Sequence, residues 1–410
     1  MWTTKEFVGG PLKIEDPFPT NFSSQLMNIQ FYLPTNCIPK KSSETSLKSF
    51  ANLQKASSQL NLFTNMSWRF FRPMHLAFAA IVAVAICFPG CANGMSAERV
   101  IDSPLLTEKI STNRTIKVDL NGNGDFTSVQ EAINSVPKGN SQWVIIHLRK
   151  GVYREKVHVP KDKPYIFLRG NGRGRTAIAW SQSSVDNKAS ATFTVEAKHF
   201  IAFGISFKNE APTGIAYTSQ NQSVAAFVGA DMVAFYHCAF FSTHNTLFDY
   251  KGRHYYDNCY IQGSIDFIFG RGRSLFHNCE IFVLQDKRIK IRGSITAQNR
   301  GSPQDNSGFV FVEGKVYGIG GVYLGRAKGA YSTVVFAKTY LSRTIVPHGW
   351  TDWSYHGGSD HLFHAEYDCR GPGADTSERG HWAKQLTEKE AAYWTSIDFI
   401  NGKDWLPVWL

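Results

Sequence analysis

The nine residues RHYYDNCYI at positions 253–261 are one of three closely similar segments that decide the fold of this chain. The segment VAFYHCAF at 233–240 precedes them, RSLFHNCEI at 273–281 follows them, and the three align without gaps. Their cysteines recur after 21 and then 20 residues. Repeats with a period in this range are typical of solenoids, in which each unit stacks on the one before.

The composition of the repeats indicates strands rather than helices. Each unit consists of short β-branched and aromatic runs broken by Gly, Asn and Asp, with little helical periodicity. Looser copies occur at 200–207 and 332–338. Leucine-rich repeats have a similar period, but their leucine–asparagine pattern is missing here. The sequence therefore predicts an all-β fold, a parallel β-helix, with an amphipathic helix at 129–136 that caps its open end.

Four cysteines lie in the part of the chain that contains the repeats: Cys238, Cys259, Cys279 and Cys369. Stacked cysteines form either an internal ladder of small hydrophobic side chains or disulfides between adjacent coils, and both interpretations stay open. No pair has the CxxC spacing of zinc sites, so we expect no metal and no other cofactor.

The segment 66–94 has the features of a secretory signal peptide. A basic start is followed by a thirteen-residue apolar run from Leu76 to Phe88 and by small residues that form an A-x-G cleavage site. The alternative is a type II membrane anchor, but the run is shorter than the ~20 residues that a spanning helix needs. We therefore expect secretion without stable membrane insertion.

The domain organisation follows from this segment. A signal peptide belongs at the N-terminus, so residues 1–65, which show no sustained periodicity, are expected to be unstructured or an extension of the gene model before a true start at Met66. A linker is expected at 95–115 and a single catalytic β-helix domain at 116–407.

The chain is basic, with a net charge of +11, which favours a polyanionic partner. Nucleic acid is one candidate, but a secretory signal favours an extracellular acidic polymer, so we expect no nucleic-acid partner. In a secreted chain Asn113 is a candidate glycosylation site, whereas the second sequon, at Asn221, adjoins the predicted cleft and is discounted.

The stretch IQGSIDFIFG at 261–270 carries the main candidate site. It holds a single carboxylate, Asp266, in an otherwise apolar run, and burying a charge there is costly unless the site uses it. Residues one coil apart lie on neighbouring strands, about 4.8 Å apart. Asn245 is one coil before Asp266 and Gln222 is one coil earlier still, so we expect the three side chains to form a polar stripe on one face.

Several motifs resemble those of the pectinesterases (pectin methylesterases), over roughly 116–407. They are GNGDFTSVQEAI at 122–133, GVYREKV at 151–157, DFIFG at 266–270, LGRAKG at 324–329 and GPGA at 371–374. The resemblance implies a right-handed β-helix that hydrolyses methyl esters of homogalacturonan (pectin) in the plant cell wall, without a metal or cofactor. It also implies a secreted monomer and a proteinaceous pectinesterase inhibitor as a partner.

The resemblance assigns a role to each site residue. The residue matching Asp266 is the nucleophile, the one matching Arg326 orients it, and the one matching Gln222 stabilises the oxyanion. Phe267 and Lys328 join Gln222 and Arg326 as expected substrate contacts. Lys328 stands where the family commonly has a tryptophan that stacks on sugar rings.

Two neighbouring residues depart from the family, which usually has Gln-Asp where this chain has His244-Asn245. The missing aspartate is the family's general acid and base, and asparagine cannot transfer a proton. Either His244 takes over proton transfer, or the enzyme is slow, or the protein binds pectin without hydrolysing it. Asp249, four residues past Asn245, matches a separate aspartate of the family and is not expected to substitute.

Two other β-helical classes act on pectin. A lyase typically needs an acidic calcium-binding cluster, and a polygalacturonase needs several paired acids. The predicted stripe offers a single carboxylate, which favours the esterase, with a non-catalytic pectin-binding protein as the alternative.

Overall fold

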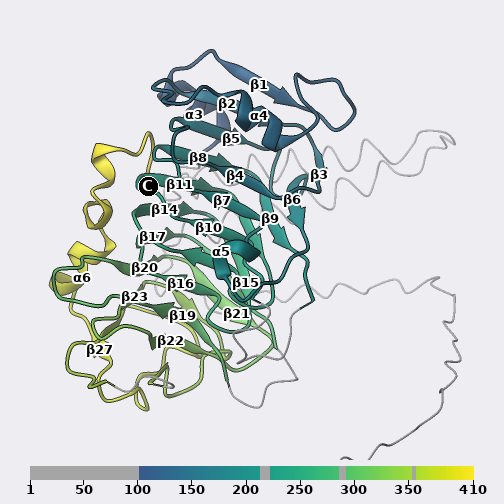
Figure 1. Ribbon diagram of the computed structural model, residues 1–410. Helices are drawn as coiled ribbons and strands as arrows, with labels where there is room; N and C mark the ends of the chain where they lie inside the picture. Colours follow the sequence, from purple (N-terminus) through teal and green to yellow (C-terminus); the bar gives the residue numbers. More distant parts are fainter. Residues whose placement is uncertain (1–100, 213–221, 286–291, 353–356) are drawn as a thin grey trace, which may run out of the picture. The chain divides into compact units, whose positions relative to one another are not determined.

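The computed structural model describes residues 101–212, 222–285, 292–352 and 357–410, which form strands in three parallel sheets (Figure 1). Sheet 1 contains, in spatial order, β1 (Thr115–Val118), β2 (Val144–Leu148), β5 (Ile166–Arg169), β8 (Phe200–Phe203), β11 (Val233–Tyr236), β14 (Arg253–Asp257), β17 (Arg273–His277), β20 (Gly308–Val312), β23 (Thr333–Ala337), β26 (Phe363–Tyr367) and β27 (Lys384–Gln385). Sheet 2 contains β4 (Val157–Val159), β7 (Phe193–Val195), β10 (Ala226–Val228), β13 (Leu247–Asp249), β16 (Ile268–Gly270), β19 (Ser294–Gln298), β22 (Tyr323–Ala327) and β25 (Trp350–Thr351). Sheet 3 contains β3 (Gly151–Tyr153), β6 (Thr176–Trp180), β9 (Ser206–Asn209), β12 (Ala239–Phe241), β15 (Tyr260–Gly263), β18 (Glu280–Val283), β21 (Lys315–Gly318) and β24 (Tyr340–Leu341).

Successive coils of the chain add one strand to each sheet, as the repeats predict. Tyr236, Asp257 and His277 occupy one register position on β11, β14 and β17, so the sequence period of 21 and then 20 residues is the length of one coil. In sheet 1 the neighbours β11, β14, β17, β20 and β23 lie side by side along the molecule (Figure 1). The predicted right-handed parallel β-helix is confirmed.

The interior is filled by stacked side chains from equivalent positions. Five aromatic rings of sheet 1 follow one another with centroid separations of 4.4 to 5.3 Å, because one coil's ring lies directly over the next: Phe235, Tyr256, Phe276, Phe311 and Phe336. Their stacking adds specific contact energy to the burial of large apolar area.

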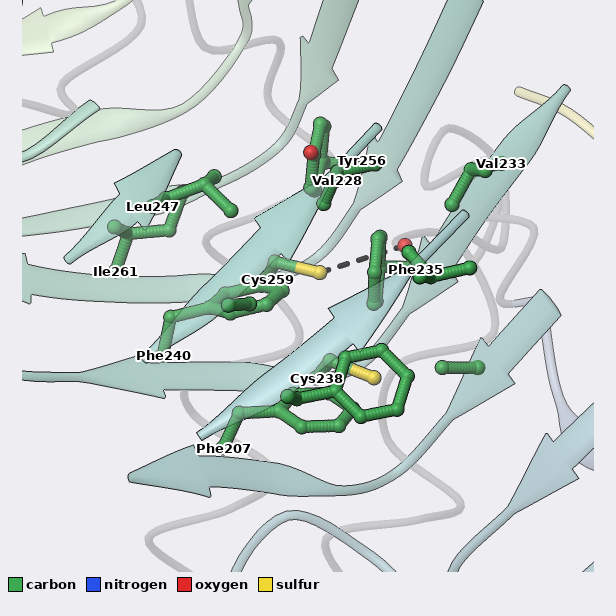
Figure 2. Packing of buried hydrophobic residues seen from close by; sticks show 14 of the residues in the cluster. Phe207, Val228, Val233, Phe235, Cys238, Phe240, Leu247, Tyr256, Cys259 and Ile261 are labelled. Atoms are coloured by element: carbon green, nitrogen blue, oxygen red, sulfur yellow. Dashed lines mark hydrogen bonds between the residues drawn. The ribbon is translucent and has the colours of Figure 1, made fainter. Parts of the chain in front are cut away.

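The repeated cysteines form an internal ladder rather than disulfides. Cys238, Cys259 and Cys279 are buried and carry free thiols, and Cys369 is also free. Figure 2 shows Cys238 and Cys259 among aromatic rings of the core, with the Cys259 thiol donating to the Phe235 carbonyl at 3.4 Å. Of the two interpretations left open by the sequence, the ladder is the one that the structure shows.

The residue before each repeated cysteine explains another part of the pattern. His237, Asn258 and Asn278 have φ angles of 51°, 51° and 47°, which is left-handed backbone. Asparagine tolerates this conformation better than most residues because its short polar side chain hydrogen-bonds locally. The Asn-Cys dipeptides therefore mark the tight turns between sheet 1 and sheet 3.

The N-terminal end of the β-helix is capped by α4 (Val129–Ser135), as predicted for 129–136. Its apolar face is buried against β1, β2 and β4. The Glu155 carboxylate accepts hydrogen bonds from the Ser128 hydroxyl and from the backbone N–H groups of Val129 and Gln130. A carboxylate at this position satisfies free N–H groups and complements the helix dipole.

The described part of the predicted linker at 95–115 differs from the expectation. It contains α3 (Ser103–Ile110), capped by Asp102, and buries Leu106 and Ile110 against sheet 1. The same apolar face is covered at the C-terminus by α6 (Glu388–Thr395) and two 3₁₀ turns, η1 (Ile397–Ile400) and η2 (Gly402–Asp404). The helix α3 packs here because sheet 1 has apolar side chains on its outer face as well as on its core face. The remaining short helix, α5 (Asn187–Ser190), lies near sheet 2.

Residues 1–65 and 66–94, the first part of the linker and Asn221 lie outside the described residues. Within the described ranges, no helix has the length and apolar character needed to cross a membrane.

A polar cluster is enclosed inside the β-helix around Asp249, which is fully buried. Its carboxylate accepts hydrogen bonds from the Tyr256 and Ser274 hydroxyls at 2.7 and 2.8 Å and from His254 Nδ1 at 3.0 Å. His254 Nε2 donates to the Ala230 carbonyl at 2.7 Å, so both ring nitrogens face acceptors. Burial lowers the pKa of His254, but the Asp249 charge and these hydrogen bonds outweigh it and raise that pKa above the ordinary 6.5.

We expect this buried ion pair to make stability depend on pH. Because the folded-state pKa of His254 is raised, its contribution is complete below about pH 6.5 and is lost as the pH rises through the folded-state pKa. Asp249→Asn should cost about 3–5 kcal/mol of unfolding free energy and flatten this pH dependence. Thermal unfolding between about pH 6 and pH 9 measures both effects. The exposed pair of Asp398 with Lys403 provides the control, since Asp398→Asn should leave the unfolding free energy and its pH dependence close to those of the wild type.

Candidate active site

The outer face of sheet 2 carries one row of side chains with one residue from each coil. The register aligns Thr194, Phe227, Phe248, Phe269, Ala297 and Arg326 in a single row across β7, β10, β13, β16, β19 and β22. The residues on either side of them face the core, because strand side chains alternate. Phe248 and Phe269 stack at 4.4 Å and are half-buried.

Asp266 lies in the turn that enters β16, with left-handed backbone at φ 46°. Its N–H donates to the Ser294 carbonyl of the next coil at 2.7 Å, which holds the turn in place. An aspartate with this φ is uncommon and costs conformational energy unless its surroundings fix it. Its side chain is 14% exposed, so the carboxylate is accessible at one edge while most of it is enclosed.

Arg326 and Ser294 hold the Asp266 carboxylate. Arg326 Nε lies 2.9 and 3.0 Å from the two carboxylate oxygens, and Arg326 Nη2 lies 2.5 Å from Oδ2. The Ser294 hydroxyl donates to Oδ1 at 2.6 Å. The Arg326 side chain is only 8% exposed and projects from the same outer row as Phe248 and Phe269. Charge-assisted, forked contacts of this kind fix the carboxylate orientation as well as stabilising it.

Asn245 occupies the position equivalent to Asp266 one coil earlier. The backbone of His244 pairs with that of Ile265, and Asn245 has the same left-handed conformation, with φ 54°. Asn245 Nδ2 donates to Oδ1 of Asn187 in α5 at 3.2 Å, and the His244 side chain is nearly buried, with 7% exposed. Asp249 faces the interior, in agreement with the expectation that it does not replace the missing acid.

Gln222 departs from the predicted three-residue stripe. When the pairing of β10 with β13 is continued to the residues before these strands, Val224 and not Gln222 stands opposite Asn245. Gln222 lies two residues earlier, half-buried, and pairs its backbone with Ser184 in an antiparallel bridge. The prediction from the repeat period was wrong for Gln222 because the backbone there pairs with Ser184, just before β10 begins.

The two remaining predicted contacts differ in exposure. Lys328 is exposed in the turn directly after β22. Phe267 is fully buried in the core, so its predicted contact with substrate does not agree with the structure. After the left-handed turn at Asp266 its side chain points inward, and Phe269, two residues on, is the aromatic residue on the outer face.

Sequence reasoning missed three parts of the site. Phe227, Phe248 and Phe269 recur every 21 residues, so the repeat alone contained the signal for the outer aromatic row. Ser294 lies 28 residues after Asp266, beyond a longer coil, and Asn187 belongs to α5 on a loop, so neither follows the period. In the part of the chain that the structure describes, no group of three or more His, Cys, Asp and Glu residues is arranged to hold a metal ion.

Comparison with known proteins identifies the family. The family model described as Pectinesterase matches residues 115–403. The chain belongs to the pectinesterase family. It is therefore a carboxylic ester hydrolase of the type whose members remove methyl groups from pectin.

Relatives of this pectinesterase share most of its β-helix. Probable pectinesterase 67 of Arabidopsis thaliana is 67% identical over 309 residues, which cover 75% of this chain and 90% of the relative. Putative pectinesterase 11 of the same plant is 43% identical over 298 residues, covering 72% and 82%. The solved structure of the pectin methylesterase from carrot is 32% identical, has a TM-score of 0.68, and matches over 72% of this chain and 96% of the carrot chain.

Proposed function

We propose that this pectinesterase hydrolyses methyl esters of homogalacturonan with Asp266 as a covalent nucleophile. The observation that supports this most is the carboxylate itself, which is held by Arg326 and Ser294 at the exposed edge of a strained turn. Strained backbone and a strongly oriented charge in one position are features of functional sites. Family membership makes methyl-esterified galacturonan the natural substrate.

The reaction then proceeds in two halves. An Asp266 oxygen attacks the ester carbonyl carbon, and the negative charge that develops on the carbonyl oxygen is stabilised by the Gln222 amide. The tetrahedral intermediate collapses, the methoxy group takes up a proton and leaves as methanol, and an acyl–aspartate anhydride remains. Water attacks the anhydride, which releases the galacturonate carboxylate and regenerates Asp266.

Proton transfer in both halves requires a titratable group, which Asn245 is not. His244 is the neighbouring residue, and an imidazole can both give a proton to methanol and take one from water. We therefore assign proton transfer to His244. Asn245 and Asn187, joined by their hydrogen bond, position the turn that carries His244.

The outer aromatic row supplies a surface for sugar rings. Phe248 and Phe269 lie in one register row with Arg326, so a polymer seated over the Asp266 carboxylate also contacts their exposed faces. Aromatic rings bind the apolar faces of sugars, and this contact compensates for Lys328 at the family's tryptophan position.

Methanol release from methyl-esterified pectin by the purified protein tests the proposal. We expect release that depends on enzyme concentration, with equal numbers of new carboxyl groups titrated. The alternative, a non-catalytic pectin-binding protein, is favoured by the departures from the family at His244 and Asn245. It predicts binding of the same pectin with no methanol above the rate without protein.

We further propose that the protein is secreted to the plant cell wall as a monomer, where it meets pectin and a proteinaceous inhibitor. The signal-like segment 66–94 and the cell-wall substrate of the family support this. Secreted protein should begin near Met95, as read by N-terminal sequencing. A membrane-bound product that retains 76–88 would contradict it and favour an anchor.

A further inference from the structure

The turns that leave sheet 2 toward sheet 1 carry exposed cations in several coils. Strands β4, β7, β13 and β16 end at aligned positions, and each is followed by a turn. Because neighbouring coils are about 4.8 Å apart, cations in these turns form a row along the β-helix. This cation row consists of Lys161, Lys198, Lys251 and Arg271.

Two acidic residues beside the cation row, Glu196 and Asp231, are engaged with other partners. Glu196 contacts Lys188 at 2.7 Å and His158 at 2.9 Å. In the β10 coil, Asp231 binds Arg253 through two contacts of 2.9 and 2.7 Å. These pairs neutralise the acids without using the row.

The lysines of the row keep their charge available. Among the described residues, Lys161, Lys198 and Lys251 have no carboxylate within ion-pair distance, and Arg271 has Asp305 at 3.6 Å. The row therefore presents a surplus of positive charge to any ligand that reaches it.

The row lies along an open groove. A hollow of about 690 Å³ is lined by Lys161, Lys198 and Lys251 together with the rings of Phe227 and Tyr250, which stack at 5.5 Å. A second hollow of about 460 Å³ continues from it, because both share Asp231 and Lys251, and it reaches Arg271. Of these two rings Tyr250 is exposed and Phe227 is buried, so one exposed ring lies among the cations, which suits a ligand made of sugar rings that carry carboxylates.

We propose that the cation row binds galacturonan segments whose carboxyl groups are already free. This inference rests on the proposed function for the source of those segments. Asp266 and Arg271 flank the same strand, β16, so carboxylates produced at Asp266 arise about one strand length from the row. A methyl ester carries no charge, so the row distinguishes product segments from unreacted ones and keeps the reacted polymer attached.

Binding of fully de-esterified polygalacturonate tests the proposal without any turnover. The variant removes three cations of the row together: Lys161→Gln, Lys198→Gln and Lys251→Gln. We expect its dissociation constant, measured by calorimetry at low ionic strength, to rise about tenfold or more, since three cations that pair with the polymer are lost together. Added salt should reduce the difference.

A matched variant removes the same charge elsewhere: Lys109→Gln, Lys150→Gln and Lys389→Gln, all of them exposed. We expect it to bind within about twofold of the wild type, since none of these three lysines belongs to the row or lines either hollow. Equal losses in both variants, or wild-type affinity in the row variant, would overturn the proposal. Fully methylated pectin should bind both proteins equally. Absence of methanol release would refute the esterase and leave this binding result valid, so the two proposals fail separately.

Discussion

Replacing Asp266 with asparagine is expected to reduce methanol release from methylated pectin by several powers of ten. Asparagine keeps the shape of the side chain and accepts a hydrogen bond from Arg326, but its amide does not attack an ester. Losses of this size are typical when a covalent nucleophile is removed. Steady-state methanol release measures the effect, and the thermal midpoint shows that the variant is folded.

A matched control exists in the turn at Asp368. This aspartate is exposed and has the same left-handed backbone, with φ 46°, but it lies on sheet 1 rather than at the site. Asp368→Asn should leave methanol release within about twofold, as surface substitutions usually do. A rate above a few per cent of wild type in Asp266→Asn would show that another group attacks the ester.

Replacing Asn245 with aspartate is expected to raise the rate if proton transfer limits this enzyme. The new carboxyl group stands one coil from Asp266, at the equivalent left-handed position. General acid–base catalysis contributes roughly 10²–10⁴-fold, far more than assay error. Asn187 accommodates the change because its side-chain amide can turn to donate to the new carboxylate. The kcat on methylated pectin measures the gain.

Replacing His244 with glutamine separates the two explanations. If His244 transfers the proton, wild type is already active, and the substitution should lower kcat sharply and remove an ionisation in the histidine range from its pH profile. Under this assignment Asn245→Asp adds little to the wild type but restores activity to His244→Gln. An active enzyme that is indifferent to both substitutions would leave water or another residue as the proton carrier.

The repeat is the part of the fold that could be predicted from the sequence. Its period equals the length of a coil, and hydrogen bonding between coils keeps equivalent residues in register, so any pattern that recurs in sequence also stacks in space. The stacking of the cysteines, the aromatic stack and the alignment of Asn245 with Asp266 follow from that period, and the amphipathic pattern at 129–136 predicted the capping helix. Motifs that resemble the pectinesterases added Arg326, whose contact with Asp266 the structure shows.

Only the tertiary structure shows the positions of the side chains that do not follow the repeat. Phe267 points into the core and Phe269 out of it because the left-handed turn at Asp266 interrupts the alternation of side chains along the strand. The repeat period does not predict the backbone angle of that turn. Gln222 leaves the aligned position because the chain bends to pair with Ser184. Thus the sequence by itself determined the β-helix and the family, and it singled out Asp266 as the proposed nucleophile. Ser294 and Asn187 come from coils and loops of irregular length, so only packing in three dimensions brings them to the site.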